Sequence, residues 1–289
     1  MPNFIVPETI SSITVKDFLR RHIGISLTSW RKTKTSGSLL INGRPASTNM
    51  LVGSGDTVSV TWQDECTIPA ANIPINILYE DEHLLVINKP AGMLVHPAKY
   101  SDTDTLANAV MNYYLQQKIS CSYHPVHRLD RNTSGAVLIS KYPHIQHLLS
   151  QNNIKHIRRI YWGVAEGLIE PSTGVIDAPI GRHPDSIIQR MVRPDGQQAI
   201  TNYHVIKKFA ATSLVELDLL TGRTHQIRVH LAYIGHPLLG DDLYGGSLND
   251  IGRQALHSAR LSFTHPVTGQ FIDISCPLPH DLQELIDSY

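Results

Sequence analysis

A carboxylate flanked by two arginines stands in the segment 127–135, whose sequence is HRLDRNTSG. Asp130 lies between Arg128 and Arg131, and an apolar run at 136–139 follows the Thr-Ser-Gly turn. Because nearby positive charge favours the ionised form of an acid, we expect Asp130 to be a carboxylate at neutral pH, able to act as a nucleophile. The alternative is an Asx-type turn with flanking surface charges.

The segment 127–135 resembles the central motif of the RluA-type pseudouridine synthases, in which this aspartate is the catalytic residue. Other segments resemble further motifs of that family in the same order, and the resemblance spans nearly all of residues 75–280. These segments are 88–97, 158–167, 220–230, 240–246 and 256–269. The resemblance implies an enzyme that detaches uracil from its ribose in RNA and reattaches it through C5.

The resemblance also assigns roles to single residues. Asp130 is the catalytic carboxylate, Arg228 pairs with it and keeps it ionised, and Tyr161 lies against the uracil ring. Attack on the ribose and attack on the base are both open. An unperturbed tyrosine, with a pKa of about 10, is a weak base at neutral pH, so removal of the C5 proton is the weakest part of the assignment. From the residues alone, Tyr161 is equally a buried strand tyrosine.

Three basic residues near these motifs are expected to contact RNA. Since the target uridine must leave its stack, Arg128 is the candidate to fill the gap by stacking its guanidinium on neighbouring bases; the alternative is a structural salt bridge. Lys89, at a strand end, either holds the following loop or reaches a phosphate, and a solvated lysine is the alternative. Arg223 lies in a turn before a helix, where free backbone N–H groups suit an anion.

Residues 1–62 are expected to form a separate basic module. They contain seven basic and three acidic residues, or +4, so the remaining 18 basic and 22 acidic residues give −4 in a neutral chain. Two short helices followed by a hairpin resemble an S4 RNA-binding domain, with Arg31, Lys32 and Lys34 facing RNA. The alternative is a module for protein contacts. A linker at 63–75 and a catalytic domain at 76–289 complete the expected organisation.

The expected fold class is α+β, because alternating strands outnumber helices after residue 75 and suit a mixed, mostly antiparallel sheet. The resemblance implies the pseudouridine synthase fold. The three cysteines are far apart and form no Cys-x-x-Cys pair, so neither a disulfide framework nor a structural zinc site is predicted. With no glycine-rich nucleotide loop, we expect no cofactor and no metal.

The N-terminal 20 residues lack the basic start and apolar block of a signal peptide, which favours a cytoplasmic protein. We expect a monomer with RNA as its partner, and the S4-like module favours ribosomal over transfer RNA.

Two other function classes compete with this interpretation. An RNA-binding ribosome assembly factor without catalysis would keep the fold but has no need of Asp130, Tyr161 and Arg228 together. A glycosidase would usually need a second positioned acid, and Asp241 or Asp242 is the candidate.

Overall fold

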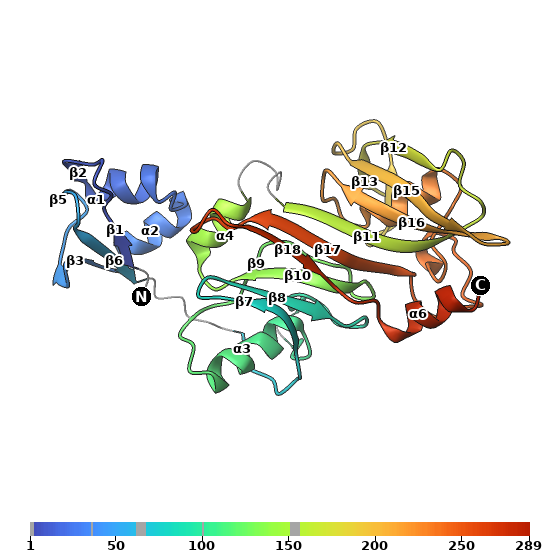
Figure 1. Cartoon of the computed structure of the whole chain (residues 1–289), viewed down its shortest axis with the longest axis horizontal. Helices are drawn as coiled ribbons and strands as arrows, with labels where there is room; N and C mark the ends of the chain where they lie inside the picture. The colour runs from blue at the N-terminus through green and yellow to red at the C-terminus, as the bar shows by residue number, and fades with distance from the viewer. Residues whose placement is uncertain (1–2, 36, 62–67, 100, 151–156) are drawn as a thin grey trace.

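The computed structural model describes residues 3–35, 37–61, 68–99, 101–150 and 157–289. Figure 1 shows a small N-terminal module, in blue, beside an elongated body built on a long sheet. The first part of the linker expected at 63–75 lies outside the described residues. No helix in the described ranges is long and apolar enough to cross a membrane.

The N-terminal module has the predicted order of two helical segments followed by a hairpin. Thr14 accepts a hydrogen bond from the Asp17 N–H and begins the first helical segment, and Trp30 of the second packs into the module's core at 4% exposure. Its elements are β1 (Asn3–Ile5), β2 (Ile13–Thr14), α1 (Val15–Asp17), the π-helix η1 (Phe18–His22), α2 (Leu27–Thr35), β3 (Ser38–Ile41), β4 (Arg44–Pro45), β5 (Leu51–Val52) and β6 (Thr57–Thr61). The sheet order is β1-β6-β3-β4, and β2 pairs with β5.

The body is organised around one ten-stranded sheet. Its elements are β7 (Asn76–Glu80), β8 (Leu84–Lys89), α3 (Leu106–Gln116), β9 (His124–Pro125), β10 (Ser134–Ser140), α4 (Pro143–Ser150), β11 (Ile157–Glu166), β12 (Thr173–Asp177), β13 (Ile180–Arg182), β14 (Arg190–Val192), β15 (Ile200–Lys208), β16 (Thr212–Leu219), α5 (Gln226–Tyr233), the 3-10 helix η3 (Asp242–Tyr244), β17 (Leu256–Thr264), β18 (Phe271–Ser275) and α6 (His280–Asp287). The main path is β12-β15-β16-β11-β17-β10-β8-β7, with β18 on β17 and β9 on β10.

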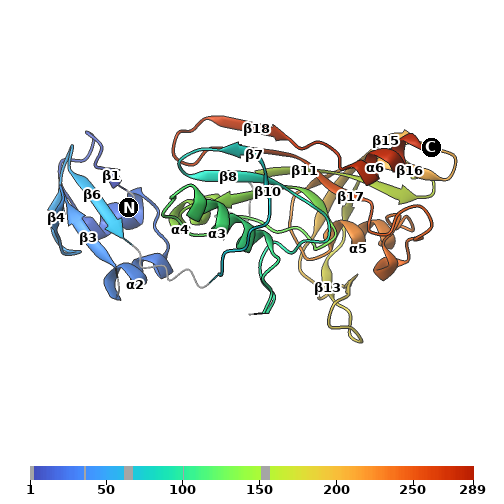
Figure 2. The same ribbon diagram turned by 90° about the horizontal axis from the view of Figure 1, so that it is seen from below.

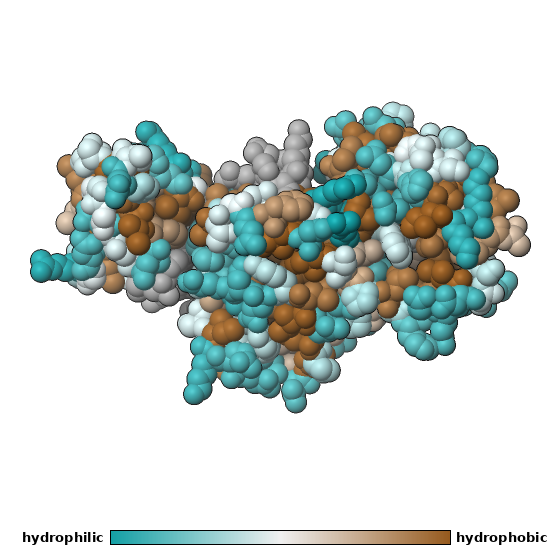
Figure 3. Space-filling model, in the orientation of Figure 1, coloured by the Kyte–Doolittle hydropathy of each residue, from teal (hydrophilic) through white to brown (hydrophobic). Residues whose placement is uncertain are grey.

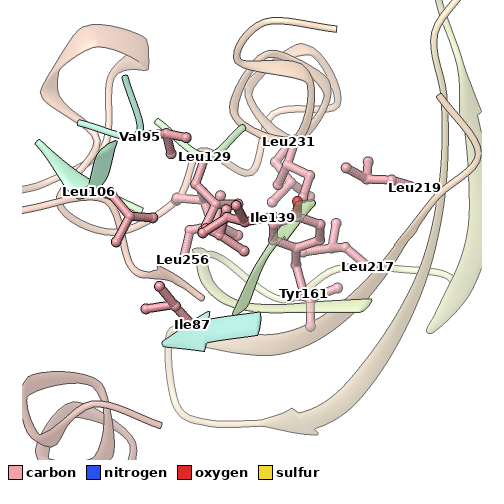
Figure 4. Close-up of a cluster of buried hydrophobic side chains, with 14 of the residues drawn as sticks. Ile87, Val95, Leu106, Leu129, Ile139, Tyr161, Leu217, Leu219, Leu231 and Leu256 are labelled. Atoms are coloured by element: carbon pink, nitrogen blue, oxygen red, sulfur yellow. The ribbon is translucent and has the colours of Figure 1, made fainter. Parts of the chain in front are cut away.

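Apolar side chains of β8 and β10 alternate between the two faces of the sheet, and both faces are covered. Leu85, Ile87 and their partners on β10 pack with α3 in the largest core cluster, part of which Figure 4 shows. Leu84 and Val86 pack on the other side with α4 and β18. Hydrophobic residues show in patches between hydrophilic ones on the face in Figure 3.

The helices and the strand order confirm the predicted α+β class with a mixed, mostly antiparallel sheet.

A short parallel seam between β10 and β17 joins the two halves of this sheet. Ser134 pairs with His257 and Gly135 with Ser258, whereas the other strand pairs are antiparallel. Gly135 has a φ of 113°, and a Cβ there would lie 2.4 Å from the carbonyl oxygen of Ser258. Only glycine fits this close approach of two backbones. The glycine of the 127–135 motif thus sets where Asp130 stands relative to β17.

Two buried histidines brace the same region. Nε2 of His127 accepts a hydrogen bond from the Leu138 N–H at 3.1 Å. His257 bonds Ser134 Oγ through Nδ1 at 3.0 Å and the Cys276 carbonyl through Nε2 at 3.2 Å. Burial lowers the pKa of His127 to about 3 and that of His257 to about 4. Both rings are therefore neutral in the folded protein at neutral pH.

Acidification is expected to destabilise the protein through these histidines. Their folded-state pKa values lie below the unfolded value of about 6.5. The contribution of these two histidines to the free energy of unfolding is therefore fully present above about pH 6.5 and is lost as pH falls toward 4. Each histidine contributes a slope of up to about 1.4 kcal/mol per pH unit. Denaturant titrations at several pH values between 7.5 and 4.5 measure that slope.

The His127→Gln variant isolates one of the two contributions. Its side-chain oxygen can still accept the Leu138 N–H, but it does not titrate. We expect lower stability at pH 7.5 and a shallower loss on acidification than in the wild type. Parallel pH dependences in the two proteins would contradict the assignment to His127.

Candidate active site

Side chains of the 127–135 motif alternate between the core and an open cavity. His127 and Leu129 are buried, Arg128 is exposed, and the Asp130 carboxylate is 21% exposed. The Thr133 N–H donates to the Asp130 carbonyl at 3.1 Å and closes the turn. Asp130 is thus held at a turn directly before β10, where a solute in the cavity can reach its carboxylate.

Lys89 lies beneath this turn and corrects one expectation. It is fully buried, and its ammonium donates to the carbonyls of Pro90, Met93 and Arg131 at 2.7, 2.8 and 3.1 Å. Burial lowers the pKa of Lys89 to about 7, although the charge of Asp130 acts to raise it. Its expected contact with an RNA phosphate is wrong, because the side chain has no access to solvent. Its role is to hold the loop after β8 against the Asp130 turn.

Arg228 on α5 faces two carboxylates at once. Its Nε and Nη2 donate to Asp241 at 2.7 and 2.6 Å, and its Nη1 lies 3.4 Å from Asp130 Oδ2. Asp241 is fully buried, and the Arg228 side chain is 8% exposed. The bidentate pair with Asp241 fixes the plane of the guanidinium, so one N–H edge remains for Asp130. The structure thus brings together the two residues that the sequence separates by almost a hundred positions.

The same pairing bears on the glycosidase alternative. Asp241 is enclosed and occupied by Arg228, whereas its neighbour Asp242 is exposed. A general acid must reach the substrate to transfer a proton. Asp241 has no such access, so it cannot serve as the second acid of a glycosidase.

His225 is a second neighbour of Asp130. Its Nε2 lies 3.9 Å from Asp130 Oδ2, and its Nδ1 is 2.8 Å from the hydroxyl of Tyr244. Burial lowers the pKa of His225, and Asp130 acts against this by raising it, so the neutral ring is favoured at neutral pH. Because the Tyr244 hydroxyl can donate to Nδ1, we assign the ring proton to Nε2, which faces the carboxylate.

Backbone strain helps to place His225. Its φ is 58°, in the left-handed region, at the residue that precedes α5. Non-glycine residues adopt this conformation at a cost that surrounding contacts must offset. Here the strained turn aims the ring at Asp130.

Tyr161 on β11 forms part of the cavity wall. Its side chain is 4% exposed and packs in the large core cluster, where Figure 4 shows it near Leu217 and Leu219. Burial raises the pKa of Tyr161, so the hydroxyl keeps its proton at neutral pH. A phenolate base is disfavoured there. The phenol ring instead offers an apolar surface beside Asp130.

These side chains line a cavity of about 260 Å³ that shares its Asp130 wall with a wider cleft of about 810 Å³. The cavity is small for a ligand site and mainly apolar in its walls, with a few polar groups converging on Asp130. Arg128 is exposed and lines both the cavity and the cleft. Arg223 lies at the cavity and is half-buried, with Nε donating to the Gln198 carbonyl at 3.0 Å.

Sequence reasoning missed Arg159 and Tyr244, and it named Asp241 only as a candidate acid of a glycosidase. Arg159 lines the cavity as a buried residue, 4% exposed, and its guanidinium donates to the Thr221 carbonyl. Tyr244 packs against Arg228, with the guanidinium carbon 4.9 Å from its ring centre. Arg159, Asp241 and Tyr244 all stand in motif segments quoted above. Nothing in the spacing distinguishes Asp241 from Asp242, because the difference between them is burial.

One group of ligand-type side chains, Asp81, His83 and His265, lies close enough together to raise the question of a metal. Nδ1 of His265 accepts hydrogen bonds from the N–H groups of Val267 and Thr268 at 3.2 and 3.0 Å. A neutral imidazole that accepts at Nδ1 carries its proton on Nε2, which here lies 3.2 Å from Asp81 Oδ2. A protonated nitrogen cannot bind a metal, so these contacts fit a hydrogen-bonded turn better than a cation site.

The amino-acid sequence of this chain is similar to those of known proteins. A family model described as RNA pseudouridylate synthase matches residues 83–233. The uncharacterized RNA pseudouridine synthase YjbO of Bacillus subtilis is 42% identical over 281 residues, which cover 95% of this chain and 98% of the relative. Ribosomal large subunit pseudouridine synthase D of Xanthomonas campestris is 39% identical over 279 residues, covering 91% of this chain and 83% of the relative.

A solved structure agrees with these matches. Human RNA Pseudouridylate Synthase Domain Containing 4 superposes with a TM-score of 0.60 and 26% identity, covering 73% of this chain and 92% of that one. The family model spans the motifs that contain Asp130, Tyr161 and Arg228. The chain therefore belongs to the RNA pseudouridine synthases, as an enzyme of the RluA type.

Proposed function

We propose that this enzyme isomerises specific uridines in structured ribosomal RNA, with Asp130 as nucleophile toward an extruded nucleotide. The observation that carries the proposal is the pairing of Asp130 with Arg228 at 3.4 Å in the wall of a cavity of about 260 Å³. The carboxylate is the nucleophilic form of an aspartate, and the guanidinium beside it lies where it can hold that carboxylate in one orientation. The buried Asp241 keeps that guanidinium in place before substrate arrives.

The other cavity residues divide the remaining tasks. Tyr161 supplies a flat apolar face against which a uracil ring can lie. His225 presents a neutral N–H near the carboxylate, where it can stabilise negative charge without an ion pair. During the reaction the N1–C1′ bond breaks, the C5–C1′ bond forms, and the proton at C5 leaves while N1 gains one.

Extrusion of the uridine is part of the proposal, because a stacked nucleotide cannot place C1′ or C5 against Asp130 within the cavity. Flipping a nucleotide costs a few kcal/mol, which contacts to the opened strand must offset. Arg128 is exposed at the cavity opening, where its guanidinium plane can stack on the bases that flank the gap.

The substrate class rests on the relatives. The Xanthomonas campestris protein and others of similar identity are named as ribosomal large subunit synthases. The N-terminal module supports RNA as the partner without distinguishing its class: Arg31, Lys32 and Lys34 are all exposed on α2. A basic helix of this kind suits RNA phosphates. Mapping pseudouridines in large-subunit ribosomal RNA from cells with and without the gene tests the proposal, and identical maps would contradict it.

Asp130→Asn is expected to abolish isomerisation while RNA affinity changes little, because the amide keeps the shape but cannot act as a nucleophile. We expect a loss of roughly 1,000-fold or more in single-turnover rate. Tritium release from RNA labelled at C5 measures the rate, and filter binding measures affinity. Appreciable residual turnover would remove Asp130 from its role.

Asp241→Asn is expected to lower both stability and the catalytic rate. The buried Arg228 would lose half of a charge-paired contact, which is expected to cost about 3 kcal/mol of unfolding free energy. With the guanidinium no longer fixed, we expect kcat to fall more than KM rises. Denaturant unfolding and steady-state kinetics measure the two effects.

Asp242→Asn is the matched control, since it makes the same change one residue later at an exposed position. We expect its unfolding free energy to change by less than about 0.5 kcal/mol. Equal stability losses in the two variants would contradict a special role for Asp241.

Replacing Arg31, Lys32 and Lys34 together by alanine is expected to weaken RNA binding and its salt dependence. Each lost phosphate contact lowers the slope of log K against log salt by about 0.7 to 0.9. Filter binding to large-subunit ribosomal RNA at several salt concentrations measures the slope. The double variant Lys207→Ala and Lys208→Ala, on exposed β15 positions, is the control. An unchanged slope in the triple variant would favour a module for protein contacts.

A further inference from the structure

The hairpin formed by β13 and β14 carries an unusual tip. Its loop, residues 183–189, extends away from the body beneath the sheet in Figure 2. Ile187 is 89% exposed and the adjacent Ile188 is 59% exposed. Two neighbouring isoleucines with this exposure contribute little to the stability of the fold, because apolar side chains stabilise a protein when folding removes them from water. Their exposure is more consistent with a contact made in a complex.

The tip has a fixed shape. Ser186 Oγ accepts hydrogen bonds from the N–H groups of Ile188 and Gln189 at 3.3 and 3.0 Å. The His183 N–H donates to the Gln189 carbonyl at 3.1 Å. These bonds hold the backbone that presents the two isoleucines, so a contact there loses less conformational entropy than one made by a disordered loop.

The hairpin is also tied to the catalytic residues. Gln189 Nε2 donates to the Leu243 carbonyl at 2.9 Å, and the Arg190 N–H donates to the Tyr244 hydroxyl at 3.0 Å. Tyr244 in turn contacts His225 and Arg228. Ile188 lines the same wide cleft as Asp130, and the segment 94–98 lines it as well. The apolar tip therefore has a fixed position relative to Asp130.

The charge around the hairpin favours a nucleic acid as the partner that contacts the two exposed isoleucines. Arg182 is exposed, and it lines a depression of about 310 Å³ together with Arg190 and Arg223. Two carboxylates oppose this charge: Asp185 is exposed in the tip loop, and Asp195 lines the same depression but is paired with Arg193. Arg182, Arg190 and Arg223 still outnumber them. Base faces are apolar and the RNA backbone is anionic, which matches an apolar tip beside guanidinium groups.

We propose that Ile187 and Ile188 form an apolar wedge that packs against the bases next to the extruded uridine and holds the paired RNA open. Arg182 and Arg190 meet the phosphates of the same strand. Apolar side chains inserted at a base step are a general means of unstacking a duplex. This inference rests on the proposed function. It adds a second contact to that of Arg128, which approaches from the cavity opening.

The test compares two hairpin RNAs of large-subunit ribosomal sequence that the protein binds, one with a uridine paired and one with the same uridine bulged. The double variant Ile187→Ser and Ile188→Ser should lose more activity on the paired RNA, where opening must be driven, than on the bulged RNA. We expect the two single-turnover losses to differ by about 10-fold or more, given the apolar area that two isoleucines bury. Val175→Ser, which changes a residue 63% exposed on β12, is the control and should affect neither.

A second measurement separates the wedge from the chemistry. A 2-aminopurine placed beside the uridine brightens when it is unstacked, whether or not the uridine reacts. The wild type should raise the fluorescence of the paired RNA, and the double variant should not. Wild-type brightening without pseudouridine would contradict the proposed function but support the wedge. Equal losses of activity on both RNAs would overturn the wedge, and so would full brightening by the double variant. If the double variant loses no activity on either RNA, the wedge is wrong and the tip is a site of protein contact.

Discussion

The guanidinium of Arg228 stands between two carboxylates of different exposure, and the site depends on that difference. Asp241 is sealed in the protein and accepts from Nε and Nη2 of the guanidinium, whereas Asp130 is reached from the cavity and faces Nη1. A buried arginine with a bidentate partner is fixed in direction before any substrate binds. The field at Asp130 is therefore set by folding and needs no rearrangement during the reaction.

The rest of the body keeps these groups in register. The parallel seam of β10 and β17 places the Asp130 turn, and Gly135 allows the two backbones to meet. Lys89 fastens the loop after β8 under the same turn. Tyr244 links α5 to the β13–β14 hairpin through its hydroxyl and its ring. The segments proposed to contact RNA and those proposed to do chemistry are thus joined by a few short hydrogen bonds and ring contacts, partly buried.

Much of the fold follows from local patterns. The alternating strands after residue 75 and the two helical segments of the N-terminal module, the first capped by Thr14, each depend on residues near in sequence, which is why they are predictable. Lys89 is different. A lysine at a strand end is usually solvated, and its burial follows from three carbonyls contributed by two loops. Because these carbonyls come from segments that are distant in sequence, the residues around Lys89 do not predict its burial.

The sequence by itself determined the family, and it singled out the aspartate proposed as the nucleophile and the arginine expected to pair with it, because motif residues keep their chemical types and order along the chain. Tertiary structure decided which of Asp241 and Asp242 is buried and that two isoleucines are left exposed beside the cleft. It also decided that His225 lies 3.9 Å from Asp130, whereas Arg131 donates to the Gly92 carbonyl. Burial and direction are set by what packs around a side chain. Those neighbours come from segments that lie close together only after folding.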